Sequence, residues 1–144
     1  MKITNRTLIQ TESLCIGYEN PRQGRTELHA NVDVKLEAGE FACLLGPNGS
    51  GKSTLLQTLC GFLPALDGTV RIGDRTIQEV SHRQMSELAS VVLTERVAVT
   101  NMTVFDLVSL GRTPYTGFFG RLKSRDKKIV VDSIKSVGLE GFEE

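Results

Sequence analysis

The eight residues at positions 46–53, GPNGSGKS, constrain the fold of this 144-residue chain more than any other segment. They match the pattern G-x-x-x-x-G-K-[ST], which is typical of a loop between a buried strand and a helix. Glycine at positions 46, 49 and 51 allows backbone conformations that are closed to other residues, so successive N–H groups can turn inward around an anion. The spacing therefore predicts a phosphate-binding loop in an α/β fold.

Both flanks of the loop carry the patterns that such a loop needs. Residues 41–45 are apolar on both faces, which predicts a strand inside a covered sheet. After the loop, leucines recur at helical spacing, and Gly61 stands where a left-handed C-terminal cap is expected. A helix over 52–60 would direct its unpaired N–H groups and the positive end of its dipole at the loop. The alternative, a glycine-rich turn that only links strand to helix, is disfavoured because strand, loop and helix agree.

Two polar side chains complete the chemistry of the loop. Lys52 can reach the β and γ phosphates of a nucleotide as a flexible point charge, and the Ser53 hydroxyl can coordinate Mg²⁺. Pro47 and Asn48 are expected to shape the turn rather than to contact phosphate. The implied ligand is ATP, or a similar nucleoside triphosphate, together with Mg²⁺.

Strands dominate the first half of the predicted chain, and helices follow in the second half. Residues 28–36 alternate apolar with polar side chains, which is typical of a half-buried antiparallel strand. Ser81 and Gln84 are spaced as a capping box, and Thr103 can cap another helix. Further strands are predicted at 8–16, 69–72 and a short buried 90–93, helices at 81–89, 103–111 and 125–137, and an ordered loop at 112–123.

The composition indicates which kinds of partner the chain can attract and in which cell compartment it is found. The 17 Lys and Arg residues balance 17 Asp and Glu residues, so no long-range attraction to nucleic acid is expected. No apolar run approaches the roughly 20 residues that cross a bilayer, and residues 1–10 lack the apolar core of a secretory signal. We therefore expect a cytoplasmic location. Cys15, Cys43 and Cys60 are expected to be reduced core residues.

The sequence around the loop resembles a known family. The string GPNGSGKSTLL, with Gly39 and Glu40 just upstream, is closely similar to the ATP-binding-cassette (ABC) ATPases. Residues 66–70 (LDGTV) resemble the return of that family into its antiparallel β-subdomain. The resemblance runs from about Leu8 onward. It implies an α/β P-loop NTPase fold with an antiparallel β-subdomain and the start of a helical subdomain at the C-terminal end.

Further segments that resemble the family imply where the nucleotide base is bound and which class of cargo is transported. Tyr18 ends the first predicted strand, where the family places an aromatic residue that stacks on adenine; an ordinary loop tyrosine is the alternative. Residues 101–104 (NMTV) and 110–115 (LGRTPY) resemble the subgroup that energises the uptake of iron-siderophore, haem and cobalamin complexes. The nucleotide-binding segment implied by the resemblance comprises Tyr18, Gly46, Pro47, Asn48, Gly49, Ser50, Gly51, Lys52, Ser53 and Thr54.

The resemblance also implies partners and a place in the cell. In that family two ATPase subunits close over ATP, and closure drives a membrane partner. We therefore expect a transmembrane permease subunit, a second copy of the ATPase subunit in the full-length protein, and a peripheral position at the inner face of the cell membrane. Two alternatives stay open: a soluble cassette ATPase without a membrane partner, and a non-catalytic nucleotide-binding module.

The sequence departs from the family in two places. Glu95 stands where the family usually has Gln beside the magnesium site, so Ser53 and Glu95 are the candidate metal ligands; a solvated loop acid is the alternative for Glu95. Residues 1–144 contain no LSGGQ-type segment, Walker B aspartate, catalytic glutamate or switch histidine. Apart from Glu95, no catalytic residue is assigned. Residues 1–144 are expected to be a partial ATP-binding domain that binds nucleotide without turning it over.

Some residues superficially resemble the Walker B strand and the switch histidine of the family. Residues 129–132 (IVVD) look like a Walker B strand, but the helical periodicity around them and the preceding Lys127 and Lys128 predict a helix. His29 falls in a predicted strand and His82 near a helix start, and neither fits the switch position. Both histidines are expected to be structural or solvated.

Overall fold

The computed structural model describes residues 6–22, 24–92, 101–117 and 119–141. The chain divides into two compact units, Met1–Ala89 and Ser90–Glu144, and each is described by itself. No helix among the described residues has both the length and the apolar character needed to span a membrane.

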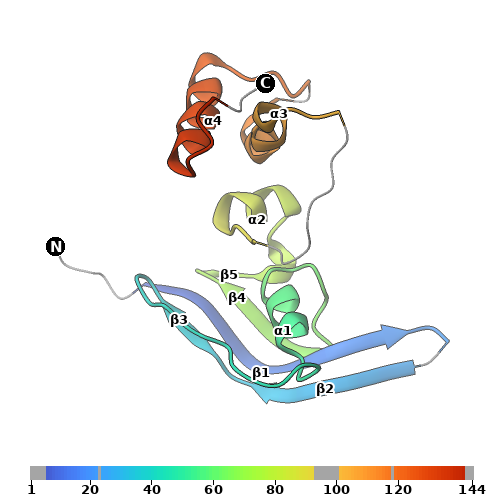
Figure 1. Ribbon diagram of the computed structural model, residues 1–144. Helices are drawn as coiled ribbons and strands as arrows, with labels where there is room; N and C mark the ends of the chain where they lie inside the picture. The colour runs from blue at the N-terminus through green and yellow to red at the C-terminus, as the bar shows by residue number, and fades with distance from the viewer. Residues whose placement is uncertain (1–5, 23, 93–100, 118, 142–144) are drawn as a thin grey trace. The chain divides into compact units, whose positions relative to one another are not determined.

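The first unit contains an antiparallel sheet with one helix against it, followed by a 3-10 helix (Ile77–Glu79) and a further short helix (Figure 1). The strands run in the order β2-β1-β4-β5, and β3 also pairs with β1. Leu14 and Ile16 of β1, Val70 of β4 and Leu59 of the helix form the buried cluster between them. The elements are β1 (Thr7–Asn20), β2 (Gly24–Val32), β3 (Lys35–Glu37), α1 (Lys52–Leu59), β4 (Asp67–Ile72) and β5 (Arg75–Thr76).

A bulge divides β1 into two halves with different partners. The first half pairs with β3 and β4, and the second half pairs with β2. Between Glu12 and Cys15 the register with β4 shifts, and Ser13 adopts a φ of 47°. Gly68 of β4, with a φ of 77°, lies against this bulge. A bulge bends its strand and increases the local twist, and β1 is drawn as a long, bent strand in Figure 1.

Four expected elements of the first unit are confirmed. β1 covers residues 8–16 and continues to Asn20, β4 covers 69–72, and α1 covers all but the last residue of 52–60. α2 (His82–Leu88) begins after Ser81, whose hydroxyl accepts the Gln84 N–H at 3.3 Å, as the capping box predicts.

The end of α1 has the cap that its sequence predicts. Gly61 has a φ of 73°. The Gly61 N–H donates to the Thr58 carbonyl at 3.1 Å, and the Phe62 N–H donates to the Gln57 carbonyl at 2.9 Å. These two bonds are the pair expected when a glycine in the left-handed region ends a helix, and they satisfy carbonyls of the last turn.

The predicted strand at 28–36 is divided in the structure. β2 ends at Val32 and β3 begins at Lys35, so the two pieces pair with different parts of β1. The Asp33 carboxylate accepts the Ser13 N–H at 2.6 Å, which joins the break to the bulge of β1. The alternating pattern is therefore correct as β structure, but one continuous strand is wrong.

The prediction of a covered strand at 41–45 is wrong. The segment is not a strand, and Phe41 and Leu45 are 91% and 88% exposed. A strand that is apolar on both faces needs neighbouring strands and cover on both sides, and the described strands all pair around β1 and β4 instead. Cys43 is exposed for the same reason, which corrects its assignment to the core, whereas Cys15 is buried and Cys60 is half-buried.

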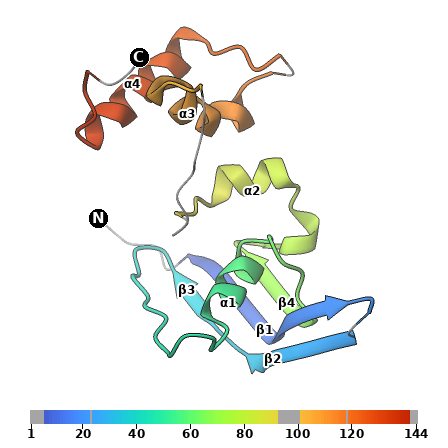
Figure 2. The ribbon, with the colours of Figure 1, turned by 45° about the vertical axis from the view of Figure 1, so that its right-hand side comes forward.

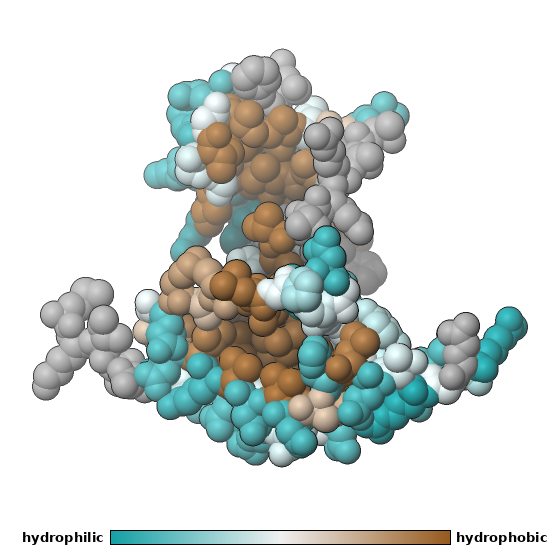
Figure 3. All heavy atoms as spheres, turned by 60° about the horizontal axis from the view of Figure 1, so that its bottom comes forward, coloured by the Kyte–Doolittle hydropathy of each residue, from teal (hydrophilic) through white to brown (hydrophobic). Residues whose placement is uncertain are grey.

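The predicted buried strand at 90–93 is wrong for its described residues, and Leu93 lies outside them. Residues 90–92 form no strand, and Val92 is 98% exposed. Hydrophobic residues consequently remain at the surface, and Figure 3 shows such residues gathered on a face of the first unit with polar residues around them.

The described residues of the second unit form two short helical segments and one longer helix. These are α3 (Val104–Ser109), a 3-10 helix (Leu110–Tyr115) and α4 (Ser124–Ser136). α3 and α4 lie side by side (Figure 2). Thr103 caps α3 as predicted, because its hydroxyl accepts the Asp106 N–H at 3.0 Å. Residues 129–132 lie in α4, so their assignment to a helix is confirmed.

Two details of this unit differ from the sequence-based expectation. Residues 112–115 belong to the 3-10 helix rather than to the predicted loop, and within this turn the Thr113 hydroxyl donates to the Leu110 carbonyl at 2.6 Å. The predicted helix at 125–137 ends at Ser136, so Val137 follows it and is 68% exposed, whereas Val130 and Ile134 within α4 are buried.

An ion pair joins the 3-10 helix to α4. The Arg112 Nε and Nη2 atoms donate to Asp126 Oδ1 at 3.1 and 2.9 Å, and Asp126 Oδ2 accepts the Lys123 N–H at 3.1 Å. The guanidinium also lies 4.0 Å from the centre of the Tyr115 ring. The Arg112 side chain, followed by the Lys123 N–H, lowers the pKa of Asp126 below its usual value near 3.8.

We expect this carboxylate to make the stability of the second unit pH-dependent. The folded-state pKa of Asp126 is lowered, so its contribution is present above the unfolded-state pKa and is lost as the pH falls through the folded-state pKa. Asp126→Asn should therefore lower the unfolding midpoint at neutral pH and flatten its fall in acid. Thermal unfolding of the full chain by circular dichroism checks this. The same flattening in Asp132→Asn, on the exposed side of α4, would contradict the assignment to Asp126.

Candidate phosphate-binding site

The loop at 46–51 leads directly into α1, whose first residue is Lys52. Gly49 and Gly51 both have a φ of 81°, which confirms that these positions need glycine. Gly46 is not in the left-handed region, so the expected conformational reason is wrong there. A Cβ atom on Gly46 would lie 2.8 Å from Ser50 Oγ, a contact that rotation of the serine side chain relieves.

The start of α1 is open to an anion. Gly51 is the N-cap residue, and it offers no side-chain acceptor to the N–H groups of the first turn. The first turn also contains no acidic residue. A helix end of this kind presents N–H donors and a partial positive charge to whatever lies in the loop.

Lys52 lies across the loop. Its Nζ atom donates to the Gly46 carbonyl at 2.8 Å and to the Pro47 carbonyl at 2.6 Å. In the part of the chain that the structure describes, no ion pair joins Lys52 to a carboxylate. The ammonium group donates to two carbonyl oxygens, and it remains available to a phosphate group.

Tyr18 of β1 reaches the first turn of α1. Its hydroxyl shares a hydrogen bond of 2.8 Å with the Thr54 hydroxyl. Thr54 is buried, whereas Tyr18 is 47% exposed. The bulge in β1 and the pairing of Tyr18 with Thr26 bring the tyrosine to this position. Two residues that are distant in sequence and were both assigned to the nucleotide thus lie in contact.

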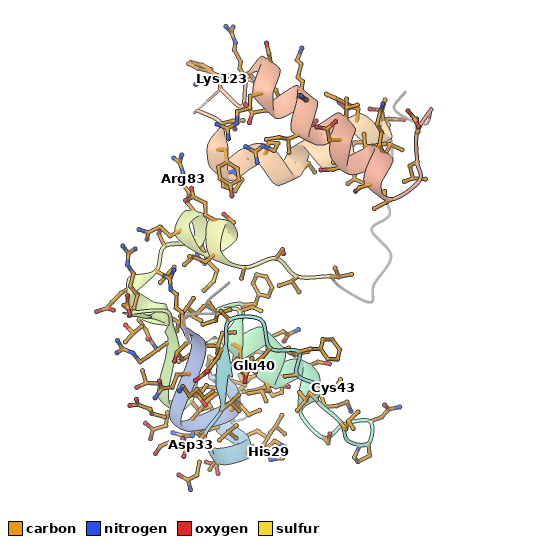
Figure 4. The ribbon with its side chains drawn as sticks, turned by 90° about the vertical axis from the view of Figure 1, so that its left-hand side faces the viewer. His29, Asp33, Glu40, Cys43, Arg83 and Lys123 are labelled. Atoms are coloured by element: carbon orange, nitrogen blue, oxygen red, sulfur yellow. The ribbon has the colours of Figure 1, made fainter. Side chains whose placement is uncertain are left out.

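His29 of β2 contacts the loop from another side. Its Nε2 atom lies 2.8 Å from the Ser50 carbonyl oxygen, and Figure 4 labels His29 on this strand. Sequence reasoning expected a structural or solvated histidine and missed this contact, because no motif relates a strand residue to the loop. A cavity of about 340 Å³ extends between the two, lined by Ile16, His29, Val32, Leu44, Lys52 and Leu55 among others.

The donors for Mg²⁺ are few in this unit. Ser53 is exposed at the start of α1, in keeping with a hydroxyl ligand. Among the described residues, no group of three or more His, Cys, Asp or Glu side chains could hold a metal ion by itself. This donor set fits Mg²⁺, which keeps water and takes phosphate oxygens beside few protein ligands. Glu95, the other candidate ligand, lies outside the described residues.

Comparison with known proteins points in one direction. The family model described as ABC transporter matches residues 29–144. An uncharacterized ABC transporter ATP-binding protein of Methanocaldococcus jannaschii is 41% identical over 133 residues, which are 92% of this chain and 44% of that protein. The iron(3+)-hydroxamate import ATP-binding protein FhuC of Bacillus subtilis is 29% identical over 136 residues, 94% of this chain and 49% of that protein.

The fold agrees with this likeness. The dimeric structure of a bacterial ABC transporter cassette matches 95% of this chain and 60% of its own with a TM-score of 0.75, at 21% sequence identity. The chain spans about half the length of the curated relatives that it matches.

Proposed function

Because the chain belongs to the ABC transporter family, we propose that it binds MgATP on the loop at residues 46–53. The observation that carries this proposal is the geometry of the loop, with two glycines at a φ of 81° and Lys52 Nζ on the carbonyls of Gly46 and Pro47. A nucleotide phosphate would replace these carbonyls as the partner of the ammonium group. The phosphate oxygens would also accept hydrogen bonds from N–H groups of the loop and of the first turn of α1.

Titration of the full chain with a fluorescent ATP analogue tests the proposal. We expect saturable binding that unlabelled ATP and ADP displace and that Mg²⁺ strengthens, because the cation offsets phosphate charge beside the Ser53 hydroxyl. Absence of saturable binding by a folded chain would overturn it.

Tyr18 is proposed as the platform for the adenine ring. Its hydroxyl is held by Thr54 at 2.8 Å, so the ring is anchored at the first turn of α1. About half of the residue is exposed, which leaves aromatic surface for a base. Tyr18 and Thr54 are 36 residues apart in the sequence, and their hydrogen bond places the ring beside the segment that follows the loop.

We expect Tyr18→Ala to weaken ATP and ADP binding equally, by about 1–3 kcal/mol, because stacking on a base does not depend on the γ phosphate. Competition titrations with both nucleotides measure this. Tyr115→Ala, in the second unit, is the matched control and should bind as the wild type does. A loss confined to ATP would contradict base stacking and indicate a role near the γ phosphate.

The whole protein is proposed to be the ATP-binding subunit of an importer, with ATP binding and hydrolysis coupled to uptake of an iron-siderophore, haem or cobalamin-like cargo. A transmembrane permease and a second ATPase subunit would be its partners, at the inner face of the cell membrane. The segments 101–104 and 110–115 support this cargo class, as does the likeness to a relative named for iron(3+)-hydroxamate import. Glu95 is proposed to act beside the magnesium site.

Uptake assays distinguish the cargo classes. A strain without the gene should lose uptake of one of three labelled cargoes, a ferric siderophore, haem or cobalamin, and should recover it with the wild-type gene but not with Lys52→Ala. Unchanged uptake of all three in the deletion strain would overturn the cargo class.

A further inference from the structure

The contact between His29 and the loop has a role of its own if the loop binds nucleotide as proposed. We propose that His29 is a positioning residue: its imidazole holds the Ser50 carbonyl and thereby orients the Gly51 N–H of the phosphate-binding loop. The inference rests on the proposed nucleotide site and assigns to it a residue outside the motif.

The direction of the bond determines which ring nitrogen of the histidine must carry a hydrogen. A carbonyl oxygen only accepts, so His29 Nε2 carries the hydrogen and donates it across the 2.8 Å separation. Both the neutral tautomer with a proton on Nε2 and the charged imidazolium can do this. The bond therefore requires a hydrogen on His29 Nε2, but it does not require a positive charge on the ring.

Peptide geometry carries the effect from the carbonyl to the loop. The described residues contain no cis peptide bond, so the Ser50–Gly51 unit is trans, and its C=O and N–H groups point in opposite directions. When His29 holds the Ser50 oxygen toward β2, the Gly51 N–H points away from β2. Rotation of this peptide plane would remove one donor from the set that a phosphate group meets.

The hydrogen bond from His29 restrains a part of the loop whose backbone is otherwise free to change conformation. Gly49 and Gly51 flank Ser50, and glycine gives the backbone more freedom than any other residue. Binding an anion requires this segment to adopt one conformation, and an anchor that is present beforehand lowers the entropic cost of binding.

His29 is itself exposed, and it stands on a strand that pairs with the buried part of β1. His29 pairs with Ile16 across β1 and β2, and Ile16 is fully buried in the core. The imidazole also lies against Gly51, where a Cβ atom would be 3.1 Å from His29 Cδ2 and 3.3 Å from Nε2. The ring therefore bonds to the Ser50 carbonyl and occupies the space beside the next residue, Gly51.

Two substitutions separate the donor from the bulk of the side chain. His29→Leu keeps a similar volume and removes the donor, whereas His29→Gln keeps an amide N–H that can reach the same carbonyl. His82→Leu is the matched control, because His82 is exposed at the start of α2. For each full-length variant, the Kd values of fluorescent ATP and ADP and the thermal unfolding midpoint without nucleotide are measured.

We expect His29→Leu to raise both Kd values about three- to tenfold, the effect of losing one hydrogen bond. His29→Gln should restore binding to within about twofold of the wild type, a rescue that depends on the hydrogen bond. His82→Leu should leave the Kd values unchanged. Unaltered binding by His29→Leu would overturn the inference, and so would equal weakening by the Leu and Gln variants. If the folded wild type itself binds neither nucleotide, the proposed nucleotide site fails, which is a separate outcome.

Discussion

Replacing Lys52 with alanine is expected to abolish most nucleotide binding, the largest functional effect among the substitutions considered. Its ammonium group is the motif cation at the loop, and it donates to the Gly46 and Pro47 carbonyls. Hydrogen bonds to charged groups are worth about twice those between neutral groups. Loss of this cation should therefore raise the Kd for ATP by at least about tenfold.

Fluorescent ATP titration of the full chain measures this effect. ATP should lose more affinity than ADP, since Lys52 is expected to reach the γ phosphate as well as the β phosphate. Lys128→Ala, on an exposed position of α4, serves as the charge-matched control and should bind normally. Wild-type affinity in folded Lys52→Ala would refute the assignment of the loop.

The largest effect on stability is expected from Gly68→Ala. Gly68 has a φ of 77°, and a Cβ atom there would lie 2.6 Å from the Glu12 carbonyl oxygen and would overlap the Ser13 carbonyl. Left-handed backbone costs an ordinary residue about 1–2 kcal/mol, and overpacking adds about 1–3 kcal/mol. Because both contacts are to backbone atoms of the β1 bulge, the strands must move apart, and a total loss of about 2–5 kcal/mol is expected.

A matched glycine isolates the packing contribution. Gly24 has a nearly identical φ of 78°, but nothing lies within 4 Å of its Cβ position. Gly24→Ala should therefore cost only the backbone strain, about 1–2 kcal/mol. Urea unfolding of both variants gives the difference, and amide hydrogen exchange in β1 and β4 assigns it to the first unit. Equal losses in the two variants would show that the bulge accommodates a methyl group.

Local spacing explains why the loop and its helix could be predicted. The left-handed conformations of Gly49, Gly51 and Gly61 follow from residue type, and the contact of Lys52 with the loop spans only six residues. The capping residues Ser81 and Thr103 act within three residues of themselves. Interactions of this range are encoded by neighbours in the chain, so their pattern is visible without the fold.

The errors fall where a segment depends on distant partners. Residues 41–45 and 90–92 are apolar enough for buried strands, but burial requires neighbours that the sheet around β1 does not supply. The break at residues 33–34 arises because β1 bulges and divides its partners between β2 and β3. A period-two pattern identifies the face of a strand but contains no information on which strand lies beside it.

By itself, the sequence determined the glycine conformations at positions 49 and 51, the start of α1 and its cap, because these depend on residue types at short, fixed separations. Only the tertiary structure decided which distant residues support the loop. The bulge of β1 brings Tyr18 to Thr54, and the pairing of β2 with β1 brings His29 to the Ser50 carbonyl. These contacts span 36 and 21 residues, and strand register and bending, which arise from the packing of the whole sheet, set their geometry.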